Sequence, residues 1–135
     1  MKKYYYENVL ANENITAKPN LVWVADITTL RILDKRFYTF LCIDAYTNNV
    51  VAHLIRATSI DSKAIVNVLA KAIDKRFVAA PKSKLIINTD RGTQFTSQLY
   101  HDFTIKYKKY FQPSMNLILI LKISMRVKLL LFKML

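Results

Sequence analysis

Two aspartates at strand positions are the residues of this chain best suited to chemistry. Asp26 lies within the apolar run 22–29, and Asp90 follows a second apolar run, 84–89. A carboxylate in the core of a sheet costs free energy unless a cation or hydrogen bonds offset its charge. A divalent metal ion is the commonest partner that two such carboxylates share. The pattern therefore predicts a shared metal site at Asp26 and Asp90.

The periodicity of the chain predicts an α/β fold that brings these two residues together. Apolar runs and turn residues predict strands, and apolar residues at four-residue spacing predict a helix. The predicted elements are, in order, strands over 21–30, 36–46 and 50–57, a helix from the capping residues 59–62 to 77, a strand over 84–89, a helix from 96, and a strand over 111–115. This order implies a mixed sheet, with three antiparallel strands followed by strand–helix crossovers. In such a sheet the first and fourth strands can lie side by side.

Length and composition fit a single domain. The chain has 135 residues, of which 53% are hydrophobic, so it can form a sizeable core. Its one cysteine, Cys42, excludes an intramolecular disulfide and fits a reducing, cytoplasmic location. The sequence has no Cys/His cluster for zinc, and a single glycine excludes a glycine-rich phosphate loop.

The charge of the chain favours a polyanionic partner. The formal net charge is +12. All the acidic residues lie within 1–102, so residues 103–135 carry basic residues alone. Nucleic acid is the first expected partner of such a chain, and an anionic membrane surface is the second. The segment 117–135 is strongly apolar, but its regularly placed basic residues make it a poor spanning helix, so a membrane is the less favoured partner.

Five short strings of residues resemble a known family. They are 19–28 (PNLVWVADIT), 42–46 (CIDAY) with 50–52 (VVA), 88–97 (NTDRGTQFTS) and 113–115 (PSM). Over about residues 17–116 the chain resembles the integrase catalytic core of transposases of the insertion-sequence-3 type. The resemblance implies a ribonuclease-H-like fold and an Asp, Asp, Glu triad that holds two Mg²⁺ or Mn²⁺ ions, with no small-molecule cofactor. It implies that Asp26 is the first carboxylate and Asp90 the second.

The chemistry of that family explains these residue types. Hard divalent cations take oxygen ligands, and two of them can activate the attacking water or 3′-hydroxyl and stabilise the leaving oxygen. The implied reaction is phosphodiester cleavage followed by strand transfer into target DNA. The implied partners are DNA and further subunits, either in a homo-oligomer or in a mixed assembly with intact transposase.

The third carboxylate of the family is missing. The family glutamate lies roughly thirty-five residues after the second aspartate, where this chain has Lys122, Arg126 and Lys128. No acidic residue follows Asp102, and after Asn116 the composition turns abruptly to Leu, Ile, Lys and Met. Such a change is what a reading-frame slip in AT-rich DNA produces.

We therefore expect a truncated, frameshifted fragment. Residues 1–18 are interpreted as a lead-in or linker remnant, 19–116 as a partial catalytic core, and 117–135 as a basic apolar tail. The fold is then incomplete at its C-terminal end, and we expect the chain to lack the family's activity.

Residues near the two aspartates have two interpretations each. Asp44 ends a predicted strand, where it either caps the following turn or supports the site. Arg91, Thr93 and Gln94 contact DNA phosphate or position the metal loop on the functional interpretation, and supply ordinary loop polarity on the other.

A second basic group, Lys106, Lys108 and Lys109, alternates with two tyrosines. These lysines either line a DNA groove or form a solvated helix face.

The sequence thus predicts DNA integration or transposition as the class of function. One alternative is a non-catalytic nucleic-acid-binding remnant that poisons an intact transposase by mixed assembly. Another is a membrane-associating protein dominated by residues 117–135. A ribonuclease is a weaker third, because the fold supports it but the motifs do not.

Overall fold

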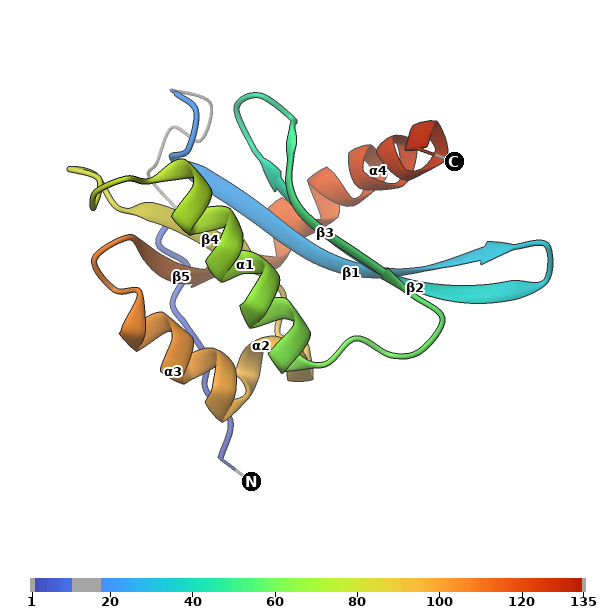
Figure 1. The fold of residues 1–135 in the computed structure, drawn as a ribbon, viewed down its shortest axis with the longest axis horizontal. Helices are drawn as coiled ribbons and strands as arrows, with labels where there is room; N and C mark the ends of the chain where they lie inside the picture. Colours follow the sequence, from blue (N-terminus) through green and yellow to red (C-terminus); the bar gives the residue numbers. More distant parts are fainter. Residues whose placement is uncertain (1, 11–17, 135) are drawn as a thin grey trace.

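A computed structural model describes residues 2–10 and 18–134. The described chain forms one mixed sheet with helices on both faces (Figure 1). The elements are, in order, β1 (Val22–Ile32), β2 (Lys35–Asp44), β3 (Val50–Arg56), α1 (Ser62–Arg76), β4 (Leu85–Thr89), α2 (Thr93–Thr96), α3 (Gln98–Lys106), β5 (Phe111–Met115) and α4 (Leu117–Met134).

The sheet has the predicted topology. Its strand order is β3-β2-β1-β4-β5, in which β1, β2 and β3 pair antiparallel and β4 pairs parallel with both β1 and β5. Tight turns join the antiparallel strands. Leu33 and Asp34 between β1 and β2 have φ of 48° and 66°, and Asn48 between β2 and β3 has φ of 62°. The parallel strands are connected through helices, as crossovers require.

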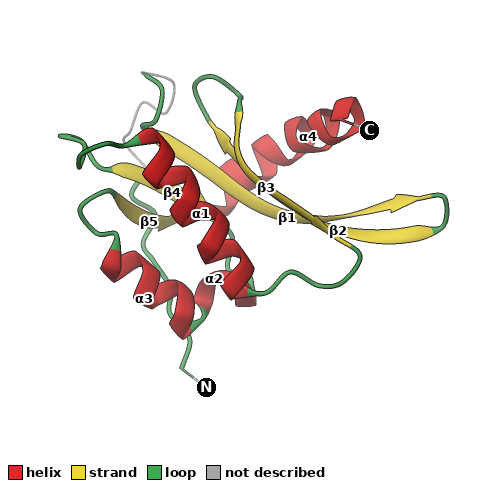
Figure 2. Cartoon of the chain, viewed as in Figure 1, coloured by secondary structure: helices red, strands yellow, loops and turns green. Residues whose placement is uncertain are grey.

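Each face of the sheet packs against a different set of helices (Figure 2). On the first face Trp23 and Ala25 of β1 join a core cluster with α1 and α3. On the opposite face Val22 and Val24 join a second cluster with α4. Because successive side chains of a strand point to opposite faces, β1 contributes to both cores along its buried half.

Helix α1 follows from the spacing of its residues. Asp61 is its N-cap, and the Asp61 carboxylate accepts a hydrogen bond from the backbone N–H of Ala64 at 2.9 Å. Ile65, Leu69 and Ile73 then bury the face that packs on the sheet.

The helix predicted from residue 96 is present as α3, which begins at Gln98. Ser97 is its N-cap, and its hydroxyl accepts a hydrogen bond from the backbone N–H of Tyr100 at 3.2 Å. The short helix α2, which ends at Thr96 and precedes α3, was not predicted.

The described part of the lead-in, residues 2–10, packs on the domain. The Tyr4 ring stacks on the His101 ring with centroids 3.8 Å apart, and the Tyr6 hydroxyl lies 3.0 Å from His101 Nδ1. Leu10 is buried in the second core cluster. Residues 11–17 of the predicted linker remnant lie outside the described residues.

The predicted tail forms a helix on the sheet. Leu119, Ile120 and Ile123 of α4 are buried against the second face, so the helix covers the apolar residues of β1 and β4 there. Within residues 2–10 and 18–134, none of the helices combines the length and apolarity needed to cross a membrane.

Candidate functional site

The sheet places Asp26 and Asp90 side by side. In the parallel register of β1 and β4, Val24 is the partner of Asn88. Continuing that register by two residues puts Asp26 opposite Asp90, which directly follows β4. Neighbouring strands lie about 4.8 Å apart. The adjacency expected from the predicted topology is therefore present.

Both aspartates lie on the face that α4 covers. Asp26 follows Val22 and Val24 at two-residue spacing, and those valines belong to the cluster with α4. Ile86 of β4 belongs to the same cluster, and Asp90 follows it at an even spacing. Helix α4 is therefore the element that can complete a site at the aspartate pair.

The environment of Asp26 disfavours its charge. The pKa of Asp26 is raised above its ordinary value of 3.8, first by burial and then by the negative charge of Asp90. A hydrogen bond to the backbone of Ile27 and the positive charge of Lys128 act in the opposite direction. A like-charged neighbour that raises a pKa is what two carboxylates sharing one site produce.

Asp90 is held by the loop that follows it. Its Oδ1 accepts a hydrogen bond from the backbone N–H of Gly92 at 2.8 Å, so the Asx-turn that competes with a metal role is present. A Cβ at position 92 would lie 2.9 Å from Asp90 Oδ1. Glycine at this position therefore lets the loop approach the carboxylate.

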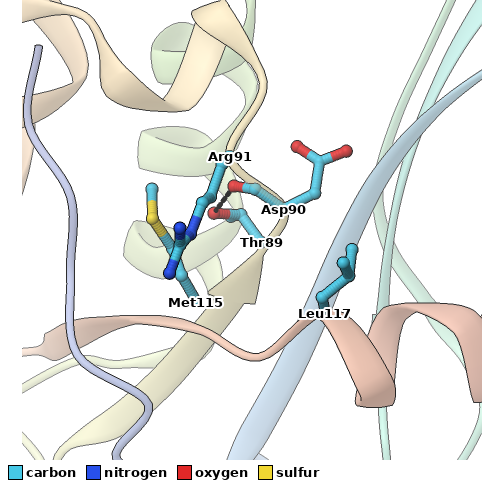
Figure 3. Close-up of a pocket in the computed structure, with 5 residues that line it drawn as sticks. All are labelled: Thr89, Asp90, Arg91, Met115 and Leu117. Carbon is cyan, nitrogen blue, oxygen red and sulfur yellow. Dashed lines mark hydrogen bonds between the residues drawn. The ribbon is translucent and has the colours of Figure 1, made fainter.

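A cleft of about 340 Å³ opens beside Asp90. It is lined by Thr89, Asp90, Arg91, Met115 and Leu117, the last being the first residue of α4. Figure 3 shows the Asp90 carboxylate turned away from the side chains of Arg91 and Met115. The cleft therefore joins the end of β4, the end of β5 and the start of α4.

Two asparagines join the start of α4 to β4 by hydrogen bonds. This pair was not identified from the sequence. Asn116 donates its backbone N–H to Asn88 Oδ1 at 2.8 Å, and Asn88 Nδ2 donates to the Asn116 carbonyl at 3.1 Å. The Asn88 side chain is fully buried. An amide in an otherwise apolar strand was the signal that could have indicated this contact.

Arg91 lines the cleft together with Asp90, and its guanidinium group contacts Tyr5. Its guanidinium carbon lies 5.7 Å from the centroid of the Tyr5 ring, in a cation–π contact. The described lead-in segment therefore reaches the edge of the site, which sequence reasoning did not anticipate.

Asp44 caps a turn. Its carboxylate accepts hydrogen bonds from the backbone N–H groups of Asn20 at 2.6 Å, Tyr46 at 2.8 Å and Thr47 at 3.1 Å. The residue is buried and faces Trp23 in the β1–β2 register, whereas Asp26 faces Leu41. The structure therefore favours the turn-capping interpretation and does not bring Asp44 to the aspartate pair.

Thr93 and Gln94 lie on a separate cleft formed with the residues that precede α1. The side-chain Nε2 of Gln94 donates to the backbone carbonyl of Ile60 at 3.3 Å, and the backbone carbonyl of Gln94 accepts from the Ser62 hydroxyl at 3.0 Å. These contacts tie α2 to the start of α1, so Gln94 holds helices together at this point.

The three lysines at the end of α3 lie away from the aspartates. Lys106 is in the last turn of α3, and Lys108 and Lys109 are in the turn before β5. Phe111, the first residue of β5, pairs with the first residue of β4, whereas Asp90 follows the last. The structure therefore does not bring these lysines to the site.

The residues present do not make up the three-carboxylate site that the resemblance implies. Among the described residues, no group of three or more His, Cys, Asp or Glu side chains could hold a metal ion. Asp26 and Asp90 are two acidic donors, and α4 contains no acidic residue. The donor set thus lacks one hard oxygen ligand that such a site requires.

Comparison with known proteins decides the family. Residues 16–115 match the integrase core domain. This chain belongs to the integrase core domain family. It is 24% identical over 96 residues to the transposase InsK for insertion sequence element IS150 of Escherichia coli K12, covering 70% of this chain and 32% of that protein. It is 28% identical over 82 residues to the transposase for IS904 of Lactococcus lactis, covering 61% and 31%.

The integrase core fold is shared with solved structures. The HTLV-2 integrase catalytic core domain, solved with magnesium in a trimeric form, matches with a TM-score of 0.63 and 23% identity, covering 87% of this chain and 72% of that chain. The catalytic domain of Mos1 mariner transposase matches with a TM-score of 0.57 and 10% identity, covering 70% and 48%. The chain spans about a third of the length of its two transposase relatives.

Proposed function

We propose that this integrase core serves DNA transposition, and that Asp26 and Asp90 occupy the positions of the family's first two catalytic carboxylates. The observation that carries the proposal is their placement opposite one another on β1 and β4, on one face of the sheet. The transposase relatives and the basic charge of the chain support DNA as the substrate.

The chain as it stands binds DNA without cleaving it. Mg²⁺ or Mn²⁺ is present in solved structures of related folds, including an HTLV-2 integrase core and a Mos1 transposase domain. Here two carboxylates are available where the family uses three, so the transition-state stabilisation that a complete site gives is lost. The proposed role of this chain is therefore to bind nucleic acid without catalysing its cleavage.

DNA binding is tested by fluorescence anisotropy of a labelled duplex between about 50 and 200 mM salt, a range over which an affinity that rests on phosphate contacts falls steeply. We expect an affinity that falls steeply as salt rises, and a weaker affinity for Arg91→Ala, beside Asp90. The matched control is Arg31→Ala, which removes the same charge from the far end of β1. An affinity that does not change with salt, or equal losses in both variants, would overturn DNA binding at this site.

Cleavage is tested on the same duplex with Mn²⁺. We expect no cleavage by the chain alone. Metal-dependent cleavage that Asp26→Asn abolishes would confirm the carboxylate assignment and refute the claim of inactivity. Cleavage unaffected by Asp26→Asn and Asp90→Asn would refute the assignment itself.

We further propose that the core can enter a mixed assembly with an intact transposase of its own kind. The HTLV-2 core has been solved in dimeric and trimeric forms, which supports association through this fold. Adding the chain to an intact transposase should lower the rate of transposition in proportion to the amount added. An unchanged rate at a large excess of the chain contradicts the proposal.

The boundary at residue 116 is also a proposal. The change of composition there supports 19–116 as core and 117–135 as the translation of another reading frame. Resequencing the locus tests this. We expect another frame to encode a glutamate at the family spacing, and a locus without one would refute the frameshift.

A further inference from the structure

A groove of about 330 Å³ runs along the edge of the sheet, between β3 and α1. Strand β3 ends the strand order, and among the described residues it pairs with β2 alone. Four consecutive residues of β3, Val50 to His53, form one wall of this β3–α1 groove. Because successive side chains of a strand point to opposite faces, a wall of four consecutive residues includes the backbone of the strand.

The edge of β3 offers both backbone groups and an apolar side chain. Val51 is the extra residue of a bulge, and from Ala52 onward residues 52–56 pair with β2 in unbroken register. An edge strand leaves alternate N–H and C=O groups without a partner strand. Ala52 lies in the core cluster on the α1 face, so Ile55 lies on the opposite face, where it is 45% exposed.

The wall that α1 supplies is positively charged. Its charged residues are Lys71, Lys75 and Arg76, and none of the described residues that line the groove is acidic. The Arg76 guanidinium carbon lies 5.6 Å from the centroid of the buried Trp23 ring, in a cation–π contact that holds this charge at the groove. Asp74 of α1 lies on another side of the helix, where the Tyr107 hydroxyl is 3.4 Å from its Oδ2.

The spacing of the two lysines matches the repeat of an extended chain. Residues from Val68 to Arg76 line the groove, so α1 runs along it for about two turns. Lys71 and Lys75 are about 6 Å apart along the helix axis. Alternate residues of a strand, which share one face, repeat at about 6.8 Å. A strand added to β3 therefore brings alternate side chains to these lysines and directs the others to the face of Ile55.

We propose that the β3–α1 groove binds an extended peptide segment of a partner protein, in which acidic and apolar residues alternate, as an added strand on β3. A second copy of this chain fits poorly, because pairing of β3 with β3 brings two sets of Lys71 and Lys75 together in a chain of net charge +12. DNA phosphates only accept hydrogen bonds, so they leave the edge carbonyls of β3 without donors. The groove lies on the α1 face of the sheet, whereas Asp26 and Asp90 lie on the α4 face, so it needs neither of them.

The experiment follows the backbone amide signals of the full chain by nuclear magnetic resonance while a short peptide of alternating Glu and Val is added. We expect the signals of residues 52–56 to shift first. Lys71→Ala with Lys75→Ala should raise the Kd about tenfold, because two exposed charge pairs are lost. The matched control, Lys63→Ala with Lys108→Ala, removes two exposed charges outside the groove and should leave the Kd nearly unchanged.

A second peptide, in which Pro replaces the central Val, keeps the charge but lacks one backbone N–H, and should bind about tenfold more weakly. Equal binding of both peptides, or equal losses in the two pairs of lysine variants, would overturn the inference. So would shifts of the 52–56 signals by a DNA duplex and not by the peptide, which assign the groove to nucleic acid. Broadening of the same signals as the free chain is concentrated would assign the edge to a second copy and overturn it too. Circular dichroism on each variant verifies the fold.

Discussion

Neutralising either aspartate of the pair should stabilise the fold. At about 5 Å, two like charges repel by about 1 kcal/mol in water and by about 3 kcal/mol at an effective dielectric constant of 20. Because both Asp26 and Asp90 reach solvent and Lys128 offsets part of the repulsion, we expect the lower figure, about 1 kcal/mol. Asparagine keeps the size of the side chain and an oxygen that can accept the Gly92 N–H.

The assay is urea unfolding of Asp26→Asn, Asp90→Asn and the double variant at pH 7. The first substitution removes the repulsion, so the second should add little, and the cycle should show a coupling of about 1 kcal/mol. The matched control, Asp34→Asn in the β1–β2 turn, should change the free energy of unfolding by a few tenths of a kcal/mol at most. Additive effects, or a destabilising Asp26→Asn, would refute the repulsive pair.

The stabilisation by Asp26→Asn should grow as pH rises. The pKa of Asp26 is higher in the folded state than its ordinary value of 3.8, so the folded state holds its proton longer. The free energy of unfolding therefore falls as pH rises from about the ordinary value through the raised pKa of Asp26. The advantage of Asp26→Asn should be absent below that window and complete at pH 7.

Three further substitutions test the packing around the site by urea unfolding. Ile123→Ala should cost about 2–4 kcal/mol, because its side chain is buried between α4 and the sheet, and a cost below 1 kcal/mol would show that α4 does not pack there. Asp44→Ala should cost about 2–4 kcal/mol, because three backbone N–H groups lose a charged acceptor, and a neutral result would exclude the capping role. Tyr100→Phe should be neutral or stabilise by about 1 kcal/mol, because the buried hydroxyl has no partner among the described residues, whereas a loss above 1 kcal/mol would reveal a missed hydrogen bond.

The sheet could be predicted from sequence because its strands are apolar and its turns are marked by their residues. The apolar run around Trp23 and the turn at Asn48 predicted the first strands, and the four-residue spacing from Ile65 predicted α1. The short helix α2 was not predicted, because a single turn of four residues is too short to show a helical period in its apolar residues.

Which residues lie at the aspartate pair could be predicted in part. The two aspartates lie together because topology alone places β1 beside β4. The contact between Tyr5 and Arg91 joins residues far apart in the chain, and no local pattern marks it. The cluster of lysines that includes Lys106 is visible in the sequence, but its place in the fold is not. The sequence therefore could not show that these lysines lie at the opposite end of β4 from Asp90.

The role of residues 117–134 was the hardest to predict. Their composition suggests a tail, and the buried positions, including Leu119 and Ile123, occupy a narrow stripe of α4. Which residues of this segment are buried depends on how the helix packs on the sheet, and composition alone does not give that packing.

The placement of the aspartate pair is tested most directly by nuclear magnetic resonance of the full chain with added Mn²⁺. We expect Mn²⁺ to broaden the backbone amide signals of Asp26, Gly92 and Leu117 first, because Gly92 contacts Asp90 and Leu117 lines the cleft with it. Broadening that begins elsewhere in the domain, or that leaves these three signals unchanged, would contradict the claim that Asp26 and Asp90 lie side by side and attract a divalent ion.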